Sequence, residues 1–318
     1  MSRPRLFLTR RLPDLVMDEI ARRFELTQPP SDEPLSRDAL LDGVHTADAM
    51  LCLLSDRIDD TILAAGPSLK IVANYAVGYN NIDRAAAARR NIVVTNTPDV
   101  LTDATADIAW ALLFAVARHV PTGHTLVQSG QWTGWAPRQL LGGDIAGQTL
   151  GIVGMGRIGR AVAERASGFR MPVLYHAARP PKVPVDPAWR AAPLDELLAT
   201  ADFISLHVPL TPETQHLIDT RAFSRMRSTA YLINTARGPV VDEAALVEAL
   251  RSHRIAGAGL DVYEQEPALH PGLASSPNVV LLPHLGSATH RTRMQMGFMC
   301  LENIDAVLTG RPAPHRVA

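Results

Sequence analysis

The sequence contains few cysteines, no long apolar run and no cluster of positive charge. Its two cysteines, Cys52 and Cys300, have apolar neighbours, which predicts buried reduced thiols rather than a disulfide or a nucleophile. No apolar run approaches bilayer length, and the N-terminus lacks the apolar core of a signal peptide, so we expect neither a membrane span nor secretion. The 31 Lys and Arg are balanced by 32 Asp and Glu and are spread along the chain, which argues against nucleic acid or an anionic membrane as a partner. We therefore predict a cytoplasmic protein.

The spacing of a metal site is also missing. The histidines are scattered and form no cluster with cysteine, so we predict no metal. What the 318 residues do contain is an alternation of short apolar runs with amphipathic segments. That alternation is typical of α/β proteins in which helices cover parallel sheets, and the length suffices for two such domains.

One apolar run leads directly into a glycine-rich turn. Residues 150–153 predict a buried strand, Gly154-Met155-Gly156-Arg157-Ile158-Gly159 follows, and residues 160–166 favour a helix. In a dinucleotide site the first glycine permits the tight turn, the second lets the backbone approach a pyrophosphate, and the third lets the helix pack closely on its strand. Such glycines can also serve a turn alone, but a strand before them and a helix after them favour cofactor binding by these six residues.

The mid-chain position of this motif predicts a discontinuous arrangement of domains. The first third holds four strand-like runs and amphipathic helices, at residues 6–8, 49–53, 70–73 and 92–94 and at residues 14–23 and 82–89. A break follows at residues 96–99. We expect a flavodoxin-like substrate-binding domain over residues 1–98 and 286–318 and a Rossmann dinucleotide-binding domain over residues 99–285, joined by two crossings at a hinged cleft. The helix from 103 to 118 is too apolar for a solvated face, which predicts burial in a subunit interface or between the domains.

Polar side chains follow the last strands of the predicted cofactor domain. The strand-like runs after the glycine motif are residues 173–175, 203–206, 231–234, 257–260 and 279–282. Ligands bind beyond the carboxyl ends of such strands. The last three runs are followed by Arg237, by the acidic pair Glu264 and Glu266, and by His284. Taken singly, these residues suggest a surface ion pair, a solvated loop acid and an ordinary loop histidine, but their occurrence at three successive strand ends favours a catalytic site.

These side chains suit hydride transfer to a 2-oxo acid. A guanidinium can hold the substrate carboxylate through two parallel hydrogen bonds, and an imidazolium can give a proton to the carbonyl oxygen as hydride arrives. A carboxylate beside the histidine favours the protonated ring near neutral pH. Arg237 and His284 are therefore predicted catalytic residues, with one of the two glutamates as the partner of the histidine.

At this point the residues resemble a known family, the D-isomer-specific 2-hydroxyacid dehydrogenases. The resemblance covers nearly the whole chain and is carried by residues 74–83 (NYAVGYNNID), 96–98 (NTP), 101–107 (LTDATAD), 234–238 (NTARG) and 283–289 (PHLGSAT). It implies that Arg237 orients the substrate and that His284 is the general acid and base. It also selects Glu266 over Glu264 as the partner of the histidine.

The resemblance implies further binding residues. Backbone N–H groups of Val77 and Gly78 would bind the substrate carboxylate, where the alternative is an ordinary strand-to-helix turn. Asp261 would bond the nicotinamide amide, although the sequence alone is equally consistent with a loop carboxylate. The other implied cofactor contacts are Thr105, His207, Val208, Pro209, Thr235, Ala236 and His284.

Within the family the sequence is most similar to glyoxylate/hydroxypyruvate reductases. This likeness lies at residues 52–56, 132–135 and 286–293. It implies a small polar 2-oxo acid as substrate and a D-2-hydroxy acid as product. In those relatives a tryptophan of the second segment reaches the neighbouring subunit's site, so Trp135 is a candidate substrate wall in a homodimer, with burial in a hinge-side core as the alternative. We expect Leu53, Arg57 and Trp135 to set the size and charge of the pocket.

The residues after Tyr175 bear on the choice of cofactor. An NAD site usually carries an acid there that bonds the ribose 2′-hydroxyl, but residues 176–182 contain none. Arg179 lies close to where an arginine would meet the 2′-phosphate of NADP. NADP(H) is therefore favoured. Many relatives carry that arginine one position earlier, where this chain has Ala178, so some use of NAD(H) is also expected.

Two alternatives stay open. The chain can be another dehydrogenase of the family that acts on 3-phosphoglycerate, formate, phosphite or a bulky 2-oxo acid. It can also be a dinucleotide-sensing protein like the C-terminal-binding-protein corepressors, which share the fold and the catalytic trio. The lack of a low-complexity tail and of a basic patch argues against a sensor. Turnover of a millimolar 2-oxo acid would separate an enzyme from a sensor.

Overall fold

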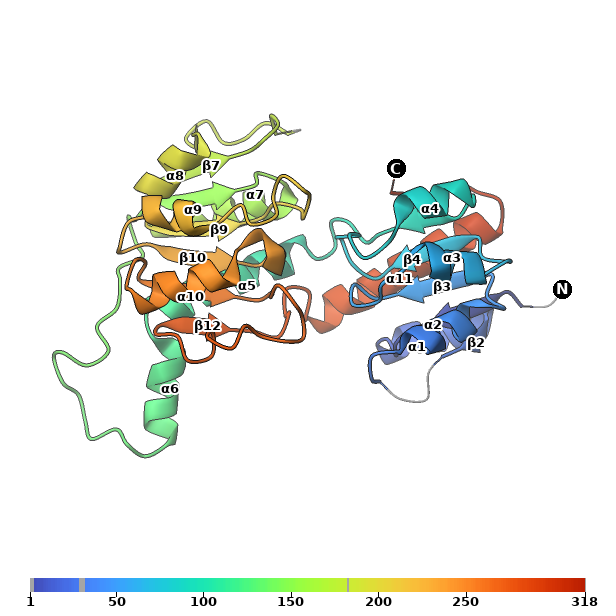
Figure 1. Cartoon of the computed structure of the whole chain (residues 1–318), viewed down its shortest axis with the longest axis horizontal. Helices are drawn as coiled ribbons and strands as arrows, with labels where there is room; N and C mark the ends of the chain where they lie inside the picture. Colours follow the sequence, from blue (N-terminus) through green and yellow to red (C-terminus); the bar gives the residue numbers. More distant parts are fainter. Residues whose placement is uncertain (1–2, 29–31, 182, 318) are drawn as a thin grey trace. The chain divides into compact units, whose positions relative to one another are not determined.

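The computed structural model describes residues 3–28, 32–181 and 183–317. The chain forms two compact units: unit 1 is Met1–Leu101 with Ser287–Ala318, and unit 2 is Thr102–Gly286. Each unit is a parallel sheet with helices packed on it (Figure 1). The predicted α/β class with two doubly wound parallel sheets is therefore confirmed.

Unit 1 contains a five-stranded parallel sheet in the order β2-β1-β3-β4-β5. This is the strand order of flavodoxin-like folds. Every residue of β3 and β4 is buried, which explains why these strands are almost uninterrupted apolar runs. The strands are β1 (Arg5–Leu8), β2 (Glu25–Thr27), β3 (Ala49–Cys52), β4 (Ile71–Asn74) and β5 (Val93–Thr95); the helices are α1 (Asp14–Arg23), α2 (Arg37–Val44), α3 (Asp60–Ala65), α4 (Arg84–Arg89) and α11 (His290–Leu308).

Unit 2 contains a seven-stranded parallel sheet in the order β12-β11-β10-β9-β6-β7-β8. The winding reverses between β6 and β9, so the glycine motif after β6 lies where such sheets bind ligands. The strands are β6 (Leu150–Val153), β7 (Val173–His176), β8 (Arg190–Ala191), β9 (Phe203–Leu206), β10 (Tyr231–Asn234), β11 (Gly257–Leu260) and β12 (Val279–Leu281); the helices are α5 (Thr102–Ala117), α6 (Val120–Gln128), α7 (Arg157–Arg165), α8 (Leu194–Thr200), α9 (Thr220–Arg225) and α10 (Glu243–Arg251), with short 3-10 turns at Ala166–Phe169 and Gly238–Val240.

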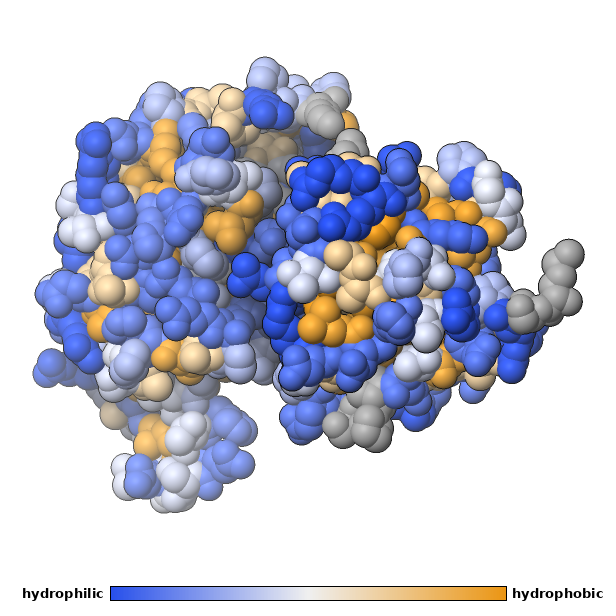
Figure 2. Space-filling view, turned by 45° about the vertical axis from the view of Figure 1, so that its right-hand side comes forward, coloured by the Kyte–Doolittle hydropathy of each residue, from blue (hydrophilic) through white to orange (hydrophobic). Residues whose placement is uncertain are grey.

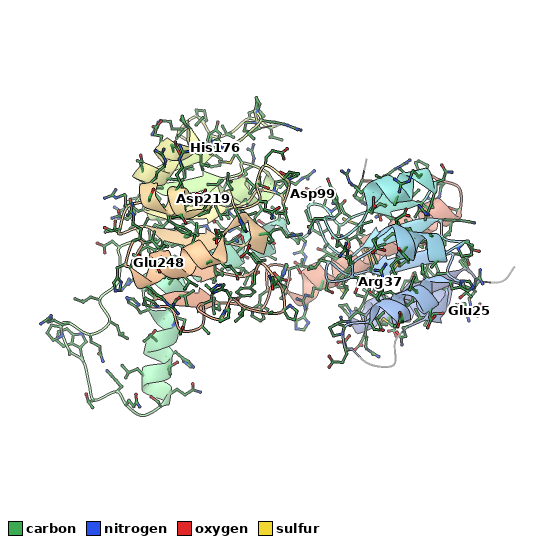
Figure 3. The ribbon with its side chains drawn as sticks, in the orientation of Figure 1. Glu25, Arg37, Asp99, His176, Asp219 and Glu248 are labelled. Carbon is green, nitrogen blue, oxygen red and sulfur yellow. The ribbon has the colours of Figure 1, made fainter. Side chains whose placement is uncertain are left out.

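Two helices start two or more residues away from their predicted starts. The helix after the glycine motif, α7, begins at Arg157 instead of residue 160, so the third glycine of the motif lies inside the helix. Helix α4 begins at Arg84 instead of residue 82, because the Asp83 carboxylate caps it by accepting the N–H of Ala86 at 2.8 Å. The capping aspartates of other helices act in the same way, as Asp219 does at the start of α9 (Figure 3).

The apolar helix α5 is buried within unit 2 itself. It packs against α7, β10 and β11, and its buried residues include Leu112, Leu113 and Val116. Its own sheet thus accounts for the apolar sequence. The sequence suggested burial in a subunit interface or between domains, whereas the structure buries the helix within unit 2, because periodicity identifies an apolar face but not the surface that covers it.

Residues 118–142 form an exposed arm that extends away from the sheet of unit 2 (Figure 1, Figure 2). The arm begins with α6, none of whose residues is buried, and continues without helix or strand. The N–H of Gly143 donates to the C=O of Ala117 at 3.0 Å, so the two ends of the arm meet. The large apolar side chains that it exposes are Val120, Val127, Trp132, Trp135, Leu140 and Leu141.

The structure bears on two expectations drawn from composition, the state of the cysteines and the absence of a membrane span. Cys52 and Cys300 are both free and buried, as predicted. Within the described ranges, no helix is long and apolar enough to cross a bilayer.

Candidate active site

The glycine motif forms a tight loop between β6 and α7. Gly154 has φ +102°, and a Cβ there would lie 2.7 Å from the carbonyl carbon of His207. A Cβ on Gly159 would lie 2.1 Å from the carbonyl oxygen of Gly154, so only glycine lets the helix pack this closely. At Gly156, by contrast, a Cβ would meet nothing within 4 Å, and the residue is exposed. The loop therefore presents open backbone where a pyrophosphate must approach.

Other features near this loop also fit a dinucleotide. Helix α7 begins without a side-chain cap, which suits an anion that binds its first N–H groups. The Oγ1 atom of Thr235, after β10, is buried without a hydrogen-bond partner among the described residues. A bound ligand can satisfy such an atom. Arg179 lies exposed in the loop after β7.

His207 and the following Val208 lie against the glycine loop. The N–H of His207 donates to the C=O of Val153 at 2.7 Å, and its imidazole Nε2 lies 2.8 Å from the hydroxyl of Ser205. Burial lowers the pKa of His207 to about 3. The ring is therefore neutral near pH 7 and is a packing and hydrogen-bonding group instead of an acid.

The carboxyl ends of β10, β11 and β12 bring the predicted catalytic trio to one edge of the sheet in unit 2. The Nδ1 atom of His284 lies 2.9 Å from Oε2 of Glu266, and Oε1 of Glu266 accepts the N–H of Tyr263 at 3.0 Å. Burial opposes ionisation of Glu266. The hydrogen bond and charge of His284 and the charge of Arg237 outweigh it and hold the pKa of this carboxyl below its ordinary value. An ionised carboxylate thus faces the imidazole.

Glu264 has different partners. Its Oε1 contacts the imidazole of His216, and its Oε2 accepts the N–H of Glu243 at 3.3 Å. In return, the N–H of Glu264 donates to the carboxylate of Glu243 at 2.8 Å. The structure therefore pairs His284 with Glu266 and places the other glutamate in a separate network.

Arg237 is held close to Glu266 by the loop after β10. The side-chain amide of Asn234 donates to the C=O of Arg237 at 3.0 Å and accepts a backbone N–H of the same loop at 3.0 Å. At Gly238 a Cβ would lie 1.8 Å from the carbonyl carbon of Tyr263, so the loops after β10 and β11 pack backbone to backbone. Burial lowers the pKa of Arg237 and the charge of Glu266 opposes this shift, but an arginine stays cationic near neutral pH.

The predicted substrate residues of unit 1 lie in the loops after β3 and β4. The side-chain amide of Asn81 donates to the C=O of Leu53 at 3.0 Å, which joins the two loops. The side-chain amide of Asn74 donates to the C=O of Gly78 at 2.7 Å, and the C=O of Val77 accepts another side-chain amide at 2.8 Å. These bonds fix the backbone of the predicted carboxylate-binding turn.

Two residues that we expected to shape the pocket are exposed. The side chain of Arg57 is 85% exposed and lies 4.0 Å from the carboxylate of Asp59. Trp135 is 82% exposed on the arm. The alternative that its indole fills a hinge-side core is therefore wrong.

Comparisons with known proteins agree with this geometry. A sequence profile described as D-isomer specific 2-hydroxyacid dehydrogenase, NAD binding domain, matches residues 110–286. The chain is 47% identical over 317 residues to the glyoxylate reductase of Thermococcus onnurineus, which covers 98% of this chain and 95% of that protein. The chain belongs to the D-isomer-specific 2-hydroxyacid dehydrogenases.

Two solved structures are similar to this dehydrogenase over nearly its whole length. A protein from Thermus thermophilus matches with a TM-score of 0.91 and 45% identity, over 99% of this chain and 100% of that one. The NADPH-dependent glyoxylate/hydroxypyruvate reductase of Sinorhizobium meliloti, solved with NADP and malonate, matches with a TM-score of 0.88 and 35% identity, over 100% and 97% of the two chains. The predicted class, an oxidoreductase that reduces 2-oxo acids with a nicotinamide dinucleotide, is confirmed.

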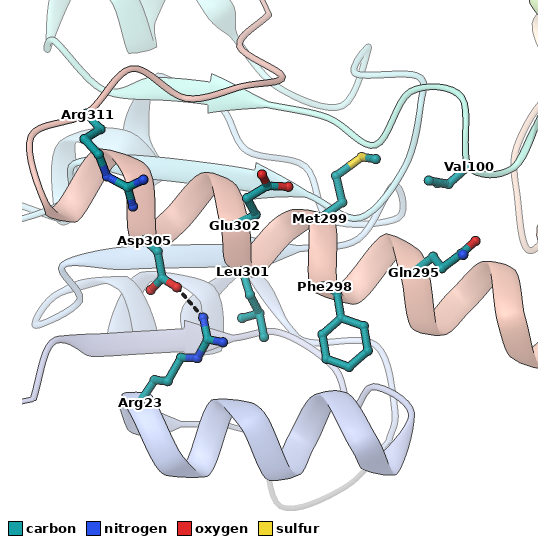
Figure 4. Close-up of a pocket in the computed structure, with 9 residues that line it drawn as sticks. All are labelled: Arg23, Val100, Gln295, Phe298, Met299, Leu301, Glu302, Asp305 and Arg311. Atoms are coloured by element: carbon teal, nitrogen blue, oxygen red, sulfur yellow. Dashed lines mark hydrogen bonds and ion pairs between the residues drawn. The ribbon is translucent and has the colours of Figure 1, made fainter.

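Unit 1 of the dehydrogenase also has a surface pocket of about 510 Å³ beside α11 (Figure 4). The ion pair between Arg23 of α1 and Asp305 of α11 lies on one side of the helix, and Met299 and Val100 lie on the other. None of the predicted substrate or cofactor residues lines this pocket. It therefore does not belong to the candidate active site.

Sequence reasoning missed the residues that hold the trio in place. Asn234 had a usable signal, because an asparagine just before a loop often bonds the backbone two residues ahead. Tyr263 had no such sequence signal. Its hydroxyl donates to the C=O of Leu282 at 2.8 Å, and this bond joins the ends of two different strands.

Proposed function

We propose that this dehydrogenase reduces glyoxylate and hydroxypyruvate to D-2-hydroxy acids, using a reduced nicotinamide dinucleotide and favouring NADPH. The observation that carries the proposal is the 2.9 Å contact between His284 and the ionised Glu266, with the cation of Arg237 close by. Two relatives support the substrate, since one is named glyoxylate reductase and another glyoxylate/hydroxypyruvate reductase.

The roles of the trio follow from its chemistry. The cofactor, when bound, supplies a hydride. Arg237 binds the carboxylate of the 2-oxo acid through its planar guanidinium. Because Nδ1 of His284 faces Glu266, Nε2 is the ring nitrogen that gives a proton to the carbonyl oxygen. Glu266 orients the ring and favours its protonated form.

The remaining binding residues divide between the two parts of the chain. We assign dinucleotide binding to residues 99–285 and substrate binding to residues 1–98 and 286–318. Val77 and Gly78 bind the substrate carboxylate through their N–H groups, and Leu53 and Trp135 limit the size of the substrate. The cofactor contacts are Thr105, Gly154 to Gly159, Arg179, His207 to Pro209, Thr235, Ala236, Asp261 and His284.

The preference for NADPH rests on the loop after β7. Its first residues, up to 182, include Arg179 and no acid that would repel a 2′-phosphate. Arg179 is exposed, so its guanidinium is accessible to a phosphate in solution. The NADPH-dependent relative of known structure supports the same choice.

We also propose a homodimer built with the arm. A segment that exposes Trp132, Trp135 and Leu141 while covering no core of its own is typical of an interface. Sedimentation of the full chain should report a dimer, and a double change of Trp135 and Leu141 to serine should shift it to a monomer. A wild-type monomer at micromolar concentration would overturn this part of the proposal.

The experiment that tests the activity is an initial-rate assay at the absorbance band of the reduced nicotinamide. Glyoxylate, hydroxypyruvate, pyruvate and 2-oxoisocaproate are each supplied with NADPH and with NADH. Fast turnover of the first two with NADPH is expected. Turnover of only the largest acid, or only with NADH, would overturn the substrate or the cofactor assignment. Tight dinucleotide binding without turnover of any acid would favour a sensor or a phosphorylated or one-carbon substrate.

A further inference from the structure

Asp261 forms two hydrogen bonds that the proposed reaction does not use. It follows β11 and is 1% exposed. Its Oδ1 accepts the N–H of Leu285 at 2.6 Å, and its Oδ2 accepts the N–H of Gly286 at 2.8 Å. These are the two residues directly after His284, so one buried carboxylate binds two consecutive amides of the turn that carries the imidazole.

That turn has a backbone conformation that needs support. His284 has φ +55°, in the left-handed region that side chains with a Cβ rarely adopt. Such a conformation persists when the surrounding structure fixes it. A second bond helps to do so, because the hydroxyl of Thr105 donates to the C=O of Gly286 at 3.0 Å. Both polar backbone groups of residue 286 are thus held by side chains of unit 2.

We propose that Asp261 is a positioning residue: its carboxylate holds the turn 284–286 so that the imidazole of His284 stays in contact with Glu266. The role is separate from the nicotinamide contact, and the two are compatible because each carboxylate oxygen can accept more than one hydrogen bond. The inference rests on the proposed acid role of His284. The charged groups around this ring are Glu266 and Asp261, with Arg237 acting on the glutamate.

The test compares Asp261→Asn with two other variants. Asparagine keeps the size but replaces one acceptor by an NH₂ group, which leaves one buried N–H of the turn unpaired. Asp219→Asn is the control, because it also removes a carboxylate that accepts a backbone N–H, at the start of α9. Glu266→Gln removes the charged partner of the ring directly.

We expect kcat of Asp261→Asn to fall roughly 10–100-fold, since misplacing the acid forfeits part of the ~10²–10⁴-fold that positioned acid catalysis supplies. The pH above which reduction slows should move down, as in Glu266→Gln. The double variant should lose little more than Glu266→Gln alone, because both changes act through one contact. Binding of ADP-ribose, which lacks the nicotinamide, should be unchanged.

Two results would overturn the inference. One is full additivity of the two changes. The other is a weaker affinity for the complete cofactor with an unaltered pH profile. That result would show that Asp261 contacts the nicotinamide but does not position His284. If Asp261→Asn does not fold, Thr105→Val removes the second bond to the turn and should move the pH profile in the same direction. NMR titration of the His284 ring in the cofactor-free protein gives a readout that needs no turnover. Failure of the proposed activity would therefore leave this inference testable.

Discussion

The imidazole Nδ1 of His284 lies 2.9 Å from Oε2 of Glu266, whereas Glu264, two residues earlier, contacts His216. Because the pKa of Glu266 is depressed, this carboxylate is charged throughout the neutral range and favours the protonated ring. In Glu266→Gln the pH above which reduction slows should therefore fall. A pH–rate profile of kcat measures the change. Glu264→Gln is the matched control, and a shift in that variant instead would contradict the pairing.

Removal of the acid itself should separate chemistry from binding. His284→Ala should lower kcat by about 10²–10⁴-fold, the usual contribution of a positioned general acid. Dissociation constants for NADPH, measured by fluorescence, should change far less than kcat, because the other proposed cofactor contacts, including the glycine loop, are untouched. His216→Ala provides the control for loss of a paired imidazole. Near-normal turnover in His284→Ala would disprove its role as the acid.

Substitution of Arg237 should affect binding and rate together. A guanidinium that holds the substrate carboxylate acts in both the ground state and the transition state, so Arg237→Ala should raise KM and lower kcat. Arg237→Lys should recover only part of the loss, since an ammonium cannot form two parallel hydrogen bonds. Steady-state kinetics with glyoxylate tests this. A change in kcat alone would show that the arginine does not bind the substrate.

The glycine loop allows a test of cofactor binding that leaves the fold intact. A Cβ at Gly156 would meet no protein atom within 4 Å, so Gly156→Ala should leave Tm nearly unchanged. It should weaken NADPH binding at least about tenfold, because backbone approach to the pyrophosphate requires glycine there. Gly168→Ala, whose Cβ also meets nothing, should change neither property. Equal affinities in the two variants would contradict the proposed position of the pyrophosphate.

Arg179 should act on one cofactor only. A charge-assisted hydrogen bond is worth about 1.5–3 kcal/mol, so Arg179→Ala should raise KM for NADPH roughly 10–100-fold while KM for NADH stays constant. Arg170→Ala, in the same unit, is a control for general loss of charge. Parallel changes with both cofactors would show that Arg179 does not recognise the 2′-phosphate.

The sequence predicted elements that local pattern determines and missed contacts between distant segments. The strands Phe203–Leu206, Tyr231–Asn234 and Gly257–Leu260 were predicted to the residue, since buried parallel strands are short apolar runs bounded by polar ones. The short edge strands β2 and β8 were not predicted, because their residues are mostly exposed and form no apolar run. The start of α4 was misplaced, since the hydrophobic pattern overlooked the cap at Asp83.

The residues of the candidate site were likewise predicted where local pattern was enough and missed where contacts between distant segments decide. Position at a strand end was enough to single out Arg237 and His284, but the choice between Glu264 and Glu266 needed the resemblance to the family. The backbone bonds of Asp261 could not have been foreseen, because they depend on the path of the turn after β12. The cytoplasmic location and the division of roles between the two parts of the chain stay predictions.

The closure of the arm by the hydrogen bond between Ala117 and Gly143 has an evolutionary consequence. Because the chain enters and leaves the arm at neighbouring points, residues 118–142 can lengthen, shorten or vanish without a change in the path of the flanking core. Changes in the length of the arm can therefore leave the backbone positions of Arg237, Glu266 and His284 unaltered. For the same reason the arm should tolerate inserted sequences, since a surface segment whose two ends meet can change length at little cost in loop-closure entropy.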